Sequence, residues 1–194
     1  MEMELGRNAI SLLNVPGDCL RWMNLGGRAT TYNAEGRRNF EVELPEDYAR
    51  DLYEDGWRIK KRGCIPGTKE YKNFEFDADV DLDDVTYKIK VTANFDSQRP
   101  PTVYRLVEGQ KKLVPLYTDG IGDRNVSIID KDYILSCDLD LNGYVATKGK
   151  KDGLKGIYLD NAVFVVRGSA ARNKYADFEI ADDDNGDVPW DPKA

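Results

Sequence analysis

Apolar and polar residues alternate along several short stretches of the chain, which is the pattern of strands with one buried face. The clearest stretches are Asn39–Leu44 and Tyr87–Phe95, where apolar side chains stand at every second position. Both are therefore predicted to be half-exposed β-strands. Short apolar runs, several of them bounded by Gly or Pro, complete the predicted strands: Asn8–Val15, Leu20–Leu25, Trp57–Arg62, Thr102–Val107, Lys112–Leu116, Val126–Ile129, Tyr133–Leu141 and Gly156–Val166.

One segment has the pattern of a helix instead. Pro45 suits a first helical position, acidic residues follow it, and Gly56 ends the segment. Tyr48 and Leu52 lie four residues apart, which places them on one helical face. One short helix among many strands predicts a mainly β protein, either a small Greek-key barrel or, as the alternative, a two-sheet sandwich.

The last eighteen residues, Asp177–Ala194, differ in composition from the rest. They carry seven of the 35 acidic residues and one of the 28 basic residues, so residues 1–176 carry 28 acidic and 27 basic residues. Such a segment cannot bury enough apolar surface to offset the entropy of ordering, which predicts a disordered acidic tail. Residues 1–176 are predicted to form one domain, with an acidic insert loop at 63–84. Because this body is nearly neutral, the net charge of −7 does not exclude a polyanionic ligand.

The chain contains no histidine, which removes Ser-His-Asp and Cys-His catalysis and histidine-ligated metals. No phosphate-binding GxxxxGK[ST] motif and no dinucleotide-binding GxGxxG motif occurs. The segment Asp138–Gly143 resembles the first half of a calcium loop, but Gly149 stands where that loop needs a bidentate glutamate. We therefore expect a protein without catalytic activity, cofactor or metal, and keep a carboxylate-metal nuclease as a distant alternative.

The mean hydropathy of −0.60 is typical of a soluble globular protein. No apolar stretch approaches the roughly 20 residues of a membrane span, and the first residues lack the pattern of a secretory signal. Three scattered cysteines, Cys19, Cys64 and Cys137, indicate reduced and packed thiols. We expect a cytoplasmic location, in the host cell if the protein is encoded by a phage, and no contact with a membrane.

Basic and aromatic residues occur together in three places outside the tail. Arginine contacts phosphate, aromatic rings stack on unpaired bases, and glycine lets a backbone approach closely. Each cluster alone also fits a solvated face or a core aromatic, and the alternation around Phe40 leaves a core position open for that ring. The predicted DNA-binding residues are Arg28, Tyr32, Asn33, Arg37, Arg38 and Phe40 in the first cluster, Trp57, Lys60 and Arg62 in the second, and Tyr144, Lys148, Lys150, Lys151 and Lys155 in the third.

The same stretches resemble a phage-type family of single-stranded-DNA-binding proteins with an OB fold. The matching pieces are Gly27 and Arg28, YNAEGRRNF (Tyr32–Phe40), LYEDGWRIK (Leu52–Lys60), and the segments Tyr87–Tyr104 and Asn142–Val166. The resemblance implies an OB-fold-like Greek-key barrel. It also implies that the protein binds and protects single strands of any sequence during bacteriophage DNA replication or recombination.

The tail is similar to the partner-recruiting tails of such proteins, because it combines acidic residues with the aromatic-proline element Val188–Trp190. The resemblance implies that replication or recombination proteins bind Asp182, Asp183, Asp184 and Trp190. The alternative is an acidic β-sandwich that serves as an interaction or structural module without nucleic acid, with a tail that only improves solubility. The oligomeric state, the binding-site size and the preference for DNA over RNA stay open.

Overall fold

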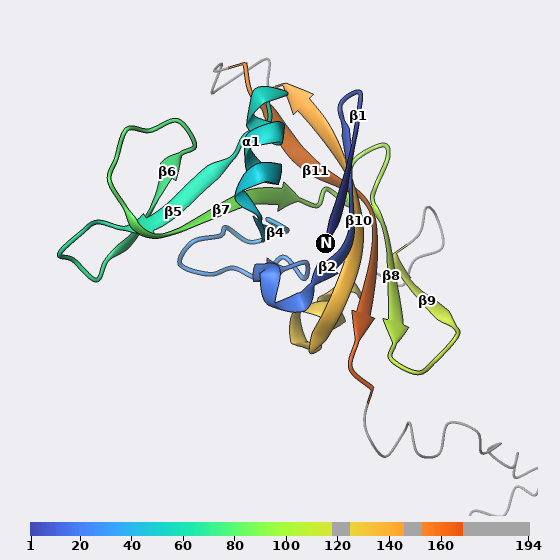
Figure 1. The fold of residues 1–194 in the computed structure, drawn as a ribbon. Helices are drawn as coiled ribbons and strands as arrows, with labels where there is room; N and C mark the ends of the chain where they lie inside the picture. The colour runs from blue at the N-terminus through green and yellow to red at the C-terminus, as the bar shows by residue number, and fades with distance from the viewer. Residues whose placement is uncertain (118–124, 146–152, 169–194) are drawn as a thin grey trace, which may run out of the picture.

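The computed structural model describes residues 1–117, 125–145 and 153–168 (Figure 1). Within these ranges the chain is mainly β with one α-helix, which confirms the fold class predicted from the sequence. The helices are α1 (Glu46–Glu54) and the 3₁₀ helices η1 (Gly17–Cys19) and η2 (Asn125–Lys131). The strands are β1 (Glu2–Gly6), β2 (Ala9–Pro16), β3 (Leu20–Asn24), β4 (Asn39–Leu44), β5 (Lys60–Cys64), β6 (Tyr71–Glu75), β7 (Asp83–Thr92), β8 (Thr102–Val107), β9 (Leu113–Tyr117), β10 (Ile134–Val145) and β11 (Lys155–Val166).

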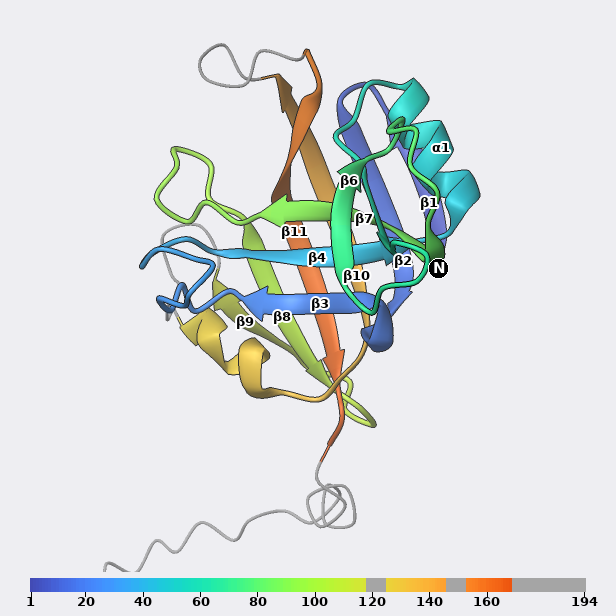
Figure 2. The ribbon, with the colours of Figure 1, turned by 90° about the vertical axis from the view of Figure 1, so that its left-hand side faces the viewer.

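All of these strands belong to one sheet, whose main path runs β1-β2-β10-β11-β7-β4-β3. The pairing of β11 with β7 is parallel, and the other pairings along the path are antiparallel. Because β2 continues through η1 into β3, the path returns to where it began and the sheet wraps around a core. Figure 2 shows β3, β4 and β7 crossing over β10 and β11. The two separate sheets of a sandwich are not seen in the part of the chain that the structure describes.

Apolar residues of the alternating strands fill the inner side of this sheet. Phe40 and Val42 of β4 and Ile89 and Val91 of β7 are all 0 % exposed. They share one core with buried residues of β10 and β11, and the ring of Phe164 meets that of Phe40 edge-on at a centroid distance of 6.3 Å. Successive side chains of a strand point to opposite faces. The residues between the buried ones therefore face outward: Asn39, Glu41, Glu43, Lys88, Lys90 and Thr92.

One end of the core is closed by α1 and the residues that follow it. Ala49 and Leu52 of α1 are buried. Gly56 then turns the chain with a φ of 82°, and the Trp57 N–H donates to the Leu52 carbonyl at 3.0 Å. Trp57 is 0 % exposed, and a Cβ on Gly143 of β10 would lie 2.6 Å from its ring. A glycine at position 143 is what leaves room for the indole.

Some predicted elements differ from the structure. The segment Val126–Ile129, predicted as a strand, lies in η2, because its first and last residues are both buried and three apart, which is one face of a 3₁₀ helix. The insert 63–84, predicted as a loop, contains β6, which pairs with β5 to form an arm that projects from the barrel (Figure 1). The strand β1, which the sequence pattern does not reveal, pairs with β2 across a turn where Asn8 has a φ of 63°.

Candidate nucleic-acid interface

The loop 25–38, which connects β3 to β4, carries most of the first predicted cluster. Asn24, the last residue of β3, holds the two ends of this loop together. Its side-chain amide donates to the carbonyls of Arg28 at 3.1 Å and Arg37 at 3.0 Å, and its side-chain oxygen accepts from the Arg28 N–H at 2.9 Å. Asn24 is 5 % exposed, so these hydrogen bonds are shielded from water. The loop therefore leaves the barrel with a fixed base.

Asp130 of η2 supports the same loop from the other side. Its carboxylate accepts hydrogen bonds from the N–H groups of Leu25 at 2.8 Å and Gly26 at 2.9 Å. Gly26 lies so close to η2 that an added Cβ would meet the Cβ of Ser127 at 2.9 Å. The 3₁₀ helix η2 therefore positions the start of the loop.

Arg28, Tyr32 and Arg37 are the accessible members of the first cluster. All three residues are exposed, and Tyr32 is 89 % exposed. Two arginines and an aromatic ring on a loop with a fixed base can contact phosphates and stack on a base without rearrangement of the barrel. These three predicted contact residues are therefore available to a ligand.

Asn33 and Arg38, which were predicted as contacts in the same cluster, have structural partners. The side-chain oxygen of Asn33 accepts from the Asn39 amide at 3.1 Å. The Arg38 guanidinium donates to the Leu25 carbonyl and lies 5.3 Å from the centroid of the Phe95 ring. Both residues hold the loop in place, so their effect on a ligand would be through the loop's position.

The outward residues of β3, β4, β7 and β11 form one continuous surface, which we call the outer face. Residues paired across neighbouring strands lie on the same side of a sheet. Asn24 pairs with Asn39, Asn39 pairs with Thr92, and Thr92 pairs with Tyr158 of β11. A polar row thus crosses the sheet from the base of loop 25–38 to β11. Asn24 and Asn39, which are 5 % and 6 % exposed, form the buried start of this row, and Thr92 and Tyr158 form its accessible end. The outer face consists of Arg21, Asn39, Glu41, Glu43, Lys88, Lys90, Thr92 and Tyr158.

Ion pairs occupy the centre of the outer face. Nη2 of Arg21 lies 2.9 Å from Oε2 of Glu43. Lys88, which is 5 % exposed, forms an ion pair with Glu41, while Lys90 beside them is exposed. The two carboxylates largely offset the three cations, so the centre of the outer face carries little net charge. A polyanion would therefore be attracted mainly by cations at its margins.

The second predicted cluster lies on β5, at the margin beyond β7. Lys60 and Arg62 pair in register with outward residues of β7, so they continue the outer face. Lys60 forms an ion pair with Glu75 of β6, and the Arg62 guanidinium lies 5.1 Å from the centroid of the Tyr71 ring. Both cations are half-buried and already engaged, which makes them weaker candidates for phosphate contacts than Arg28 and Arg37.

The third predicted cluster begins at the end of β10. Tyr144 is 55 % exposed, and its ring meets that of Tyr158 edge-on at a centroid distance of 6.4 Å. Lys155, the first residue of β11, is engaged: its Nζ lies 2.9 Å from Oδ2 of Asp55 and 4.9 Å from the centroid of the Trp57 ring. Three further members of this cluster lie outside the described residues: Lys148, Lys150 and Lys151.

Asp55, directly after α1, ties the helix to the start of β11. Its Oδ2 accepts from Nζ of Lys155 at 2.9 Å and from Nε1 of Trp57 at 2.8 Å. These hydrogen bonds, first that of Lys155 and then that of Trp57, hold the pKa of the Asp55 carboxyl below its usual range. The buried indole thus has a partner for its only polar atom.

The predicted base contacts of Phe40 and Trp57 are corrected by the structure. Both residues are 0 % exposed, whereas stacking on a base requires an exposed ring. Phe40 belongs to the inward set of β4 together with Val42 and Leu44. Trp57 fills the end of the core beneath Lys155. Both aromatics therefore build the barrel that carries the interface.

Several residues of the outer face, and Trp22 next to it in β3, were not singled out from the sequence: Arg21, Trp22, Lys88, Lys90 and Tyr158. Lys88 and Lys90 occupy the polar positions of the alternating segment Tyr87–Phe95, and that signal was enough to place them on the exposed side of a strand. Trp22 and Tyr158 carry no comparable signal, because the pairing of distant strands decides which face they occupy.

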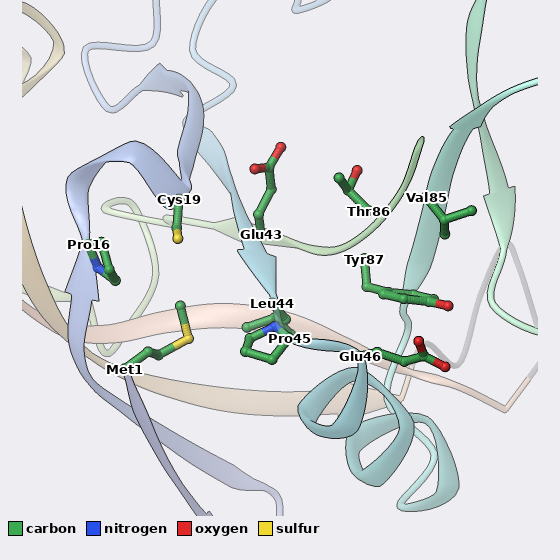
Figure 3. Close-up of a pocket in the computed structure, with 10 residues that line it drawn as sticks. All are labelled: Met1, Pro16, Cys19, Glu43, Leu44, Pro45, Glu46, Val85, Thr86 and Tyr87. Atoms are coloured by element: carbon green, nitrogen blue, oxygen red, sulfur yellow. The ribbon is translucent and has the colours of Figure 1, made fainter. Parts of the chain in front are cut away.

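A hollow lies between η1, the start of α1 and β7 (Figure 3). Its lining includes Met1, Cys19 and Tyr87 together with the carboxylates of Glu43 and Glu46, and no lysine or arginine. Both carboxylates are ion-paired, Glu43 with Arg21 and Glu46 with Arg50. No lysine or arginine side chain among the described residues lines the hollow to hold a phosphate, so it suits a nucleic acid less well than loop 25–38 does.

The other candidate groups are the cysteine thiols and possible metal ligands. The thiols of Cys19, Cys64 and Cys137 are free, and burial raises the pKa of the Cys137 thiol. Among residues 1–117, 125–145 and 153–168, no three His, Cys, Asp or Glu side chains are grouped to hold a metal ion. No helix in those ranges is long and apolar enough to cross a membrane.

Comparison with known proteins identifies the family of this chain. A family model described as "Putative phage ssDNA-binding domain" matches residues 5–192, which is nearly the whole chain. No curated protein matches the chain. The match covers the barrel, the loop 25–38 and the aromatic pair of β10 and β11, and it supports single-stranded DNA as the partner of this domain. The chain therefore belongs to the phage single-stranded-DNA-binding domain family.

Proposed function

We propose that this protein binds and protects single-stranded DNA of any sequence during phage replication or recombination, in the cytoplasm of the host cell. It acts by binding alone, with no catalysed reaction and no cofactor. Family membership supports the ligand, and the arrangement of the outer face supports the way in which that ligand is held.

The strand path supports an OB-type barrel. An OB fold is a five-stranded Greek-key barrel that binds oligonucleotides on its second and third strands and with the loops after its first and fourth strands. Here the bent strand β2–β3 takes the first place, β4 and β7 the second and third, and β10 and β11 the fourth and fifth. By this correspondence the ligand is held by loop 25–38 and by the connection between β10 and β11, of which residues 146–152 lie outside the described residues.

The observation that carries the proposal is that the exposed arginines of loop 25–38 and the exposed pair Tyr144–Tyr158, far apart in sequence, flank the same outer face. The polar row from Asn24 to Tyr158 starts at the base of loop 25–38 and ends beside the pair Tyr144–Tyr158. A single strand that crossed the outer face between loop 25–38 and this pair would meet exposed arginines at one end and exposed tyrosines at the other.

The charges of the outer face favour binding without sequence preference. Arg28 and Arg37 supply phosphate contacts, which carry no sequence information. The ion-paired centre of the face has little net charge, so bases rather than phosphates are expected to lie on it. Stacking on aromatic side chains contributes on the order of 1–3 kcal/mol per base and accepts every base.

A titration of fluorescently labelled oligothymidylate, followed by anisotropy at several salt concentrations, tests the proposal. We expect log K to fall linearly with log salt, by roughly 0.7 for each phosphate neutralised on a single strand. Duplex of the same length is expected to bind more weakly. Labelled DNA incubated with the protein and Mg²⁺ or Mn²⁺ is expected to stay intact.

A slope near zero, or equal affinity for duplex, would contradict the proposal and favour a protein-interaction module. Cleavage that persists through purification and disappears after an Asp→Asn substitution would contradict the non-catalytic assignment. These two outcomes are independent, since binding and cleavage are read from separate measurements.

The acidic tail completes the proposal, although residues 177–194 lie outside the described residues. Asp182, Asp183 and Asp184 would steer the encounter with a basic replication or recombination protein, and Trp190 would supply the buried aromatic anchor. The support for this role is the composition of the tail, which joins a run of carboxylates to Trp190 near its end.

A further inference from the structure

Trp22 is an exposed tryptophan in the middle of a strand. It lies in β3 and is 65 % exposed. The register between β3 and β4 shifts between Arg21 and Asn24, so Trp22 sits within a β-bulge. Bulges of this kind redirect a side chain and are common beside functional sites.

The backbone of Trp22 is also strained, because its φ is 56°. That left-handed region is uncommon for residues other than glycine, and it is unfavourable for a bulky side chain. Exposure of an indole to water adds a second unfavourable term. Among the described residues the Trp22 side chain makes no hydrogen bond and no ring contact, so the fold does not explain why a tryptophan occupies this position.

The neighbours of Trp22 in the chain indicate which part of a ligand its ring could contact. Arg21, on one side, faces outward and pairs with Glu41 in the strand register. Asn24, two residues further along the chain, binds the backbones of both Arg28 and Arg37. Trp22 thus stands where the outer face meets the base of loop 25–38, close in the chain to the residue that anchors the two exposed arginines.

We infer that Trp22 is a base-stacking residue, and that its indole holds one unpaired base of a strand whose neighbouring phosphates contact Arg28 and Arg37. The inference rests on the proposed function, since it assigns a contact within the same single-strand site. It specifies an interaction that requires an unpaired base, whereas arginine–phosphate contacts do not.

Two substitutions separate stacking from folding. Trp22→Gly and Trp22→Asn both remove the ring, and both residues tolerate a positive φ. We expect each variant to melt at the same temperature as the parent or higher, and to bind labelled oligothymidylate about 5- to 150-fold more weakly, the range set by the stacking contribution of one base. The salt slope should not change, because no charge is removed. Trp22→Phe should restore most of the affinity.

Quenching of tryptophan fluorescence is a second measurement, and a purely structural role of Trp22 would not affect it. In a Trp190→Phe background the tryptophans are Trp22, which is exposed, and Trp57, which is 0 % exposed. Single-stranded DNA should quench the emission of this protein, and the quenching should disappear in Trp22→Phe although that variant still binds. Leu113→Ala is the control for DNA binding and quenching. It removes an exposed apolar side chain from β9, on the other side of the barrel from loop 25–38 (Figure 1).

The outcomes distinguish this inference from the proposed function. If the parent binds single strands while Trp22→Gly and Trp22→Asn bind equally well, or if quenching persists in Trp22→Phe, the stacking role of Trp22 is overturned and the proposed function stands. If the parent shows no salt-dependent binding of single strands, the proposed function fails, and the inference fails with it.

Discussion

Tyr158 of β11 is the parallel-ladder partner of Thr92 of β7. This pairing joins the β10–β11 hairpin to the three strands β3, β4 and β7. In the described residues, no other pair of strands links these two groups on that side of the barrel. It also places an exposed aromatic pair at the end of the polar row that begins at Asn24. The outer face is therefore one surface with a basic margin and an aromatic margin.

Neighbouring arginines of loop 25–38 should respond differently to substitution. Arg28→Ala and Arg37→Ala remove exposed charges, so each should weaken single-strand binding and lower the salt slope by roughly 0.7 with no change in melting temperature. Arg38→Ala should instead lower the melting temperature, because Arg38 contacts the Leu25 carbonyl and the Phe95 ring. Anisotropy titrations and thermal melts of the three variants check this, and a stable Arg38→Ala with a reduced salt slope would contradict it.

Phe40 should behave as a core residue. Truncation of a fully buried phenylalanine removes packed area and leaves a cavity, so Phe40→Ala should destabilise the protein by about 3–5 kcal/mol. Chemical denaturation measures this loss, with Tyr32→Ala as the matched aromatic control on the same loop-to-strand segment. Tyr32 is 89 % exposed, so its removal should leave stability unchanged and reduce DNA affinity. The reverse pattern would contradict the assignment of the two rings.

The prediction for Asp55 concerns pH. Its pKa is lowered in the folded protein by the hydrogen bonds from Lys155 and Trp57. A carboxyl with a lowered folded-state pKa contributes stability that is present above its unfolded pKa and is lost as the pH falls through the folded pKa. Asp55→Asn should therefore lower the melting temperature at neutral pH, and the difference from the parent should shrink towards acid pH.

Thermal melts of the parent and Asp55→Asn across the acid range measure this difference. Glu54→Gln, one residue earlier and exposed at the end of α1, is the control and should show no such trend. A difference that stays constant with pH would mean that the ionised carboxylate of Asp55 does not support the contact between α1 and β11.

Part of this picture follows from the sequence. The alternation of Asn39–Leu44 and Tyr87–Phe95 predicts β4 and the core part of β7, and the same alternation already groups Phe40 with the inward residues Val42 and Leu44. The Gly, Thr, Asn and Arg content of Arg28–Arg38 predicts a loop, and the structure has a loop at 25–38. Local patterns of this kind are reliable because burial on one face repeats every second residue.

The rest depends on pairings between distant segments. Trp57 follows a helix as a single aromatic with no periodicity around it, so only the contact with Gly143 and Lys155 shows that it is buried. Trp22 is exposed because the β3–β4 register shifts at that point, which no local pattern indicates. Arg37 and Arg38 have the same side chain. Only the tertiary contact of Arg38 with Leu25 distinguishes its structural role from that of the exposed Arg37.

The tail should compete with DNA. Residues 177–194 carry seven acidic groups, so their deletion should tighten single-strand binding, most visibly at low salt where screening is weak. Trp190→Ala should leave DNA affinity unchanged and abolish retention of a replication or recombination partner. Equal affinities of the full and shortened proteins at low salt, together with no partner that depends on Trp190, would leave the tail as a solubility element.

Photochemical cross-linking tests the central claim most directly, namely that single-stranded DNA lies along the outer face between loop 25–38 and the end of β10. An oligothymidylate with 5-iodouracil at one position is bound, irradiated and digested, and the cross-linked peptides are identified by mass spectrometry. We predict cross-links to Trp22, Tyr32, Tyr144 or Tyr158. Cross-links confined to the β8–β9 hairpin, or to the hollow beside Tyr87, would contradict the account.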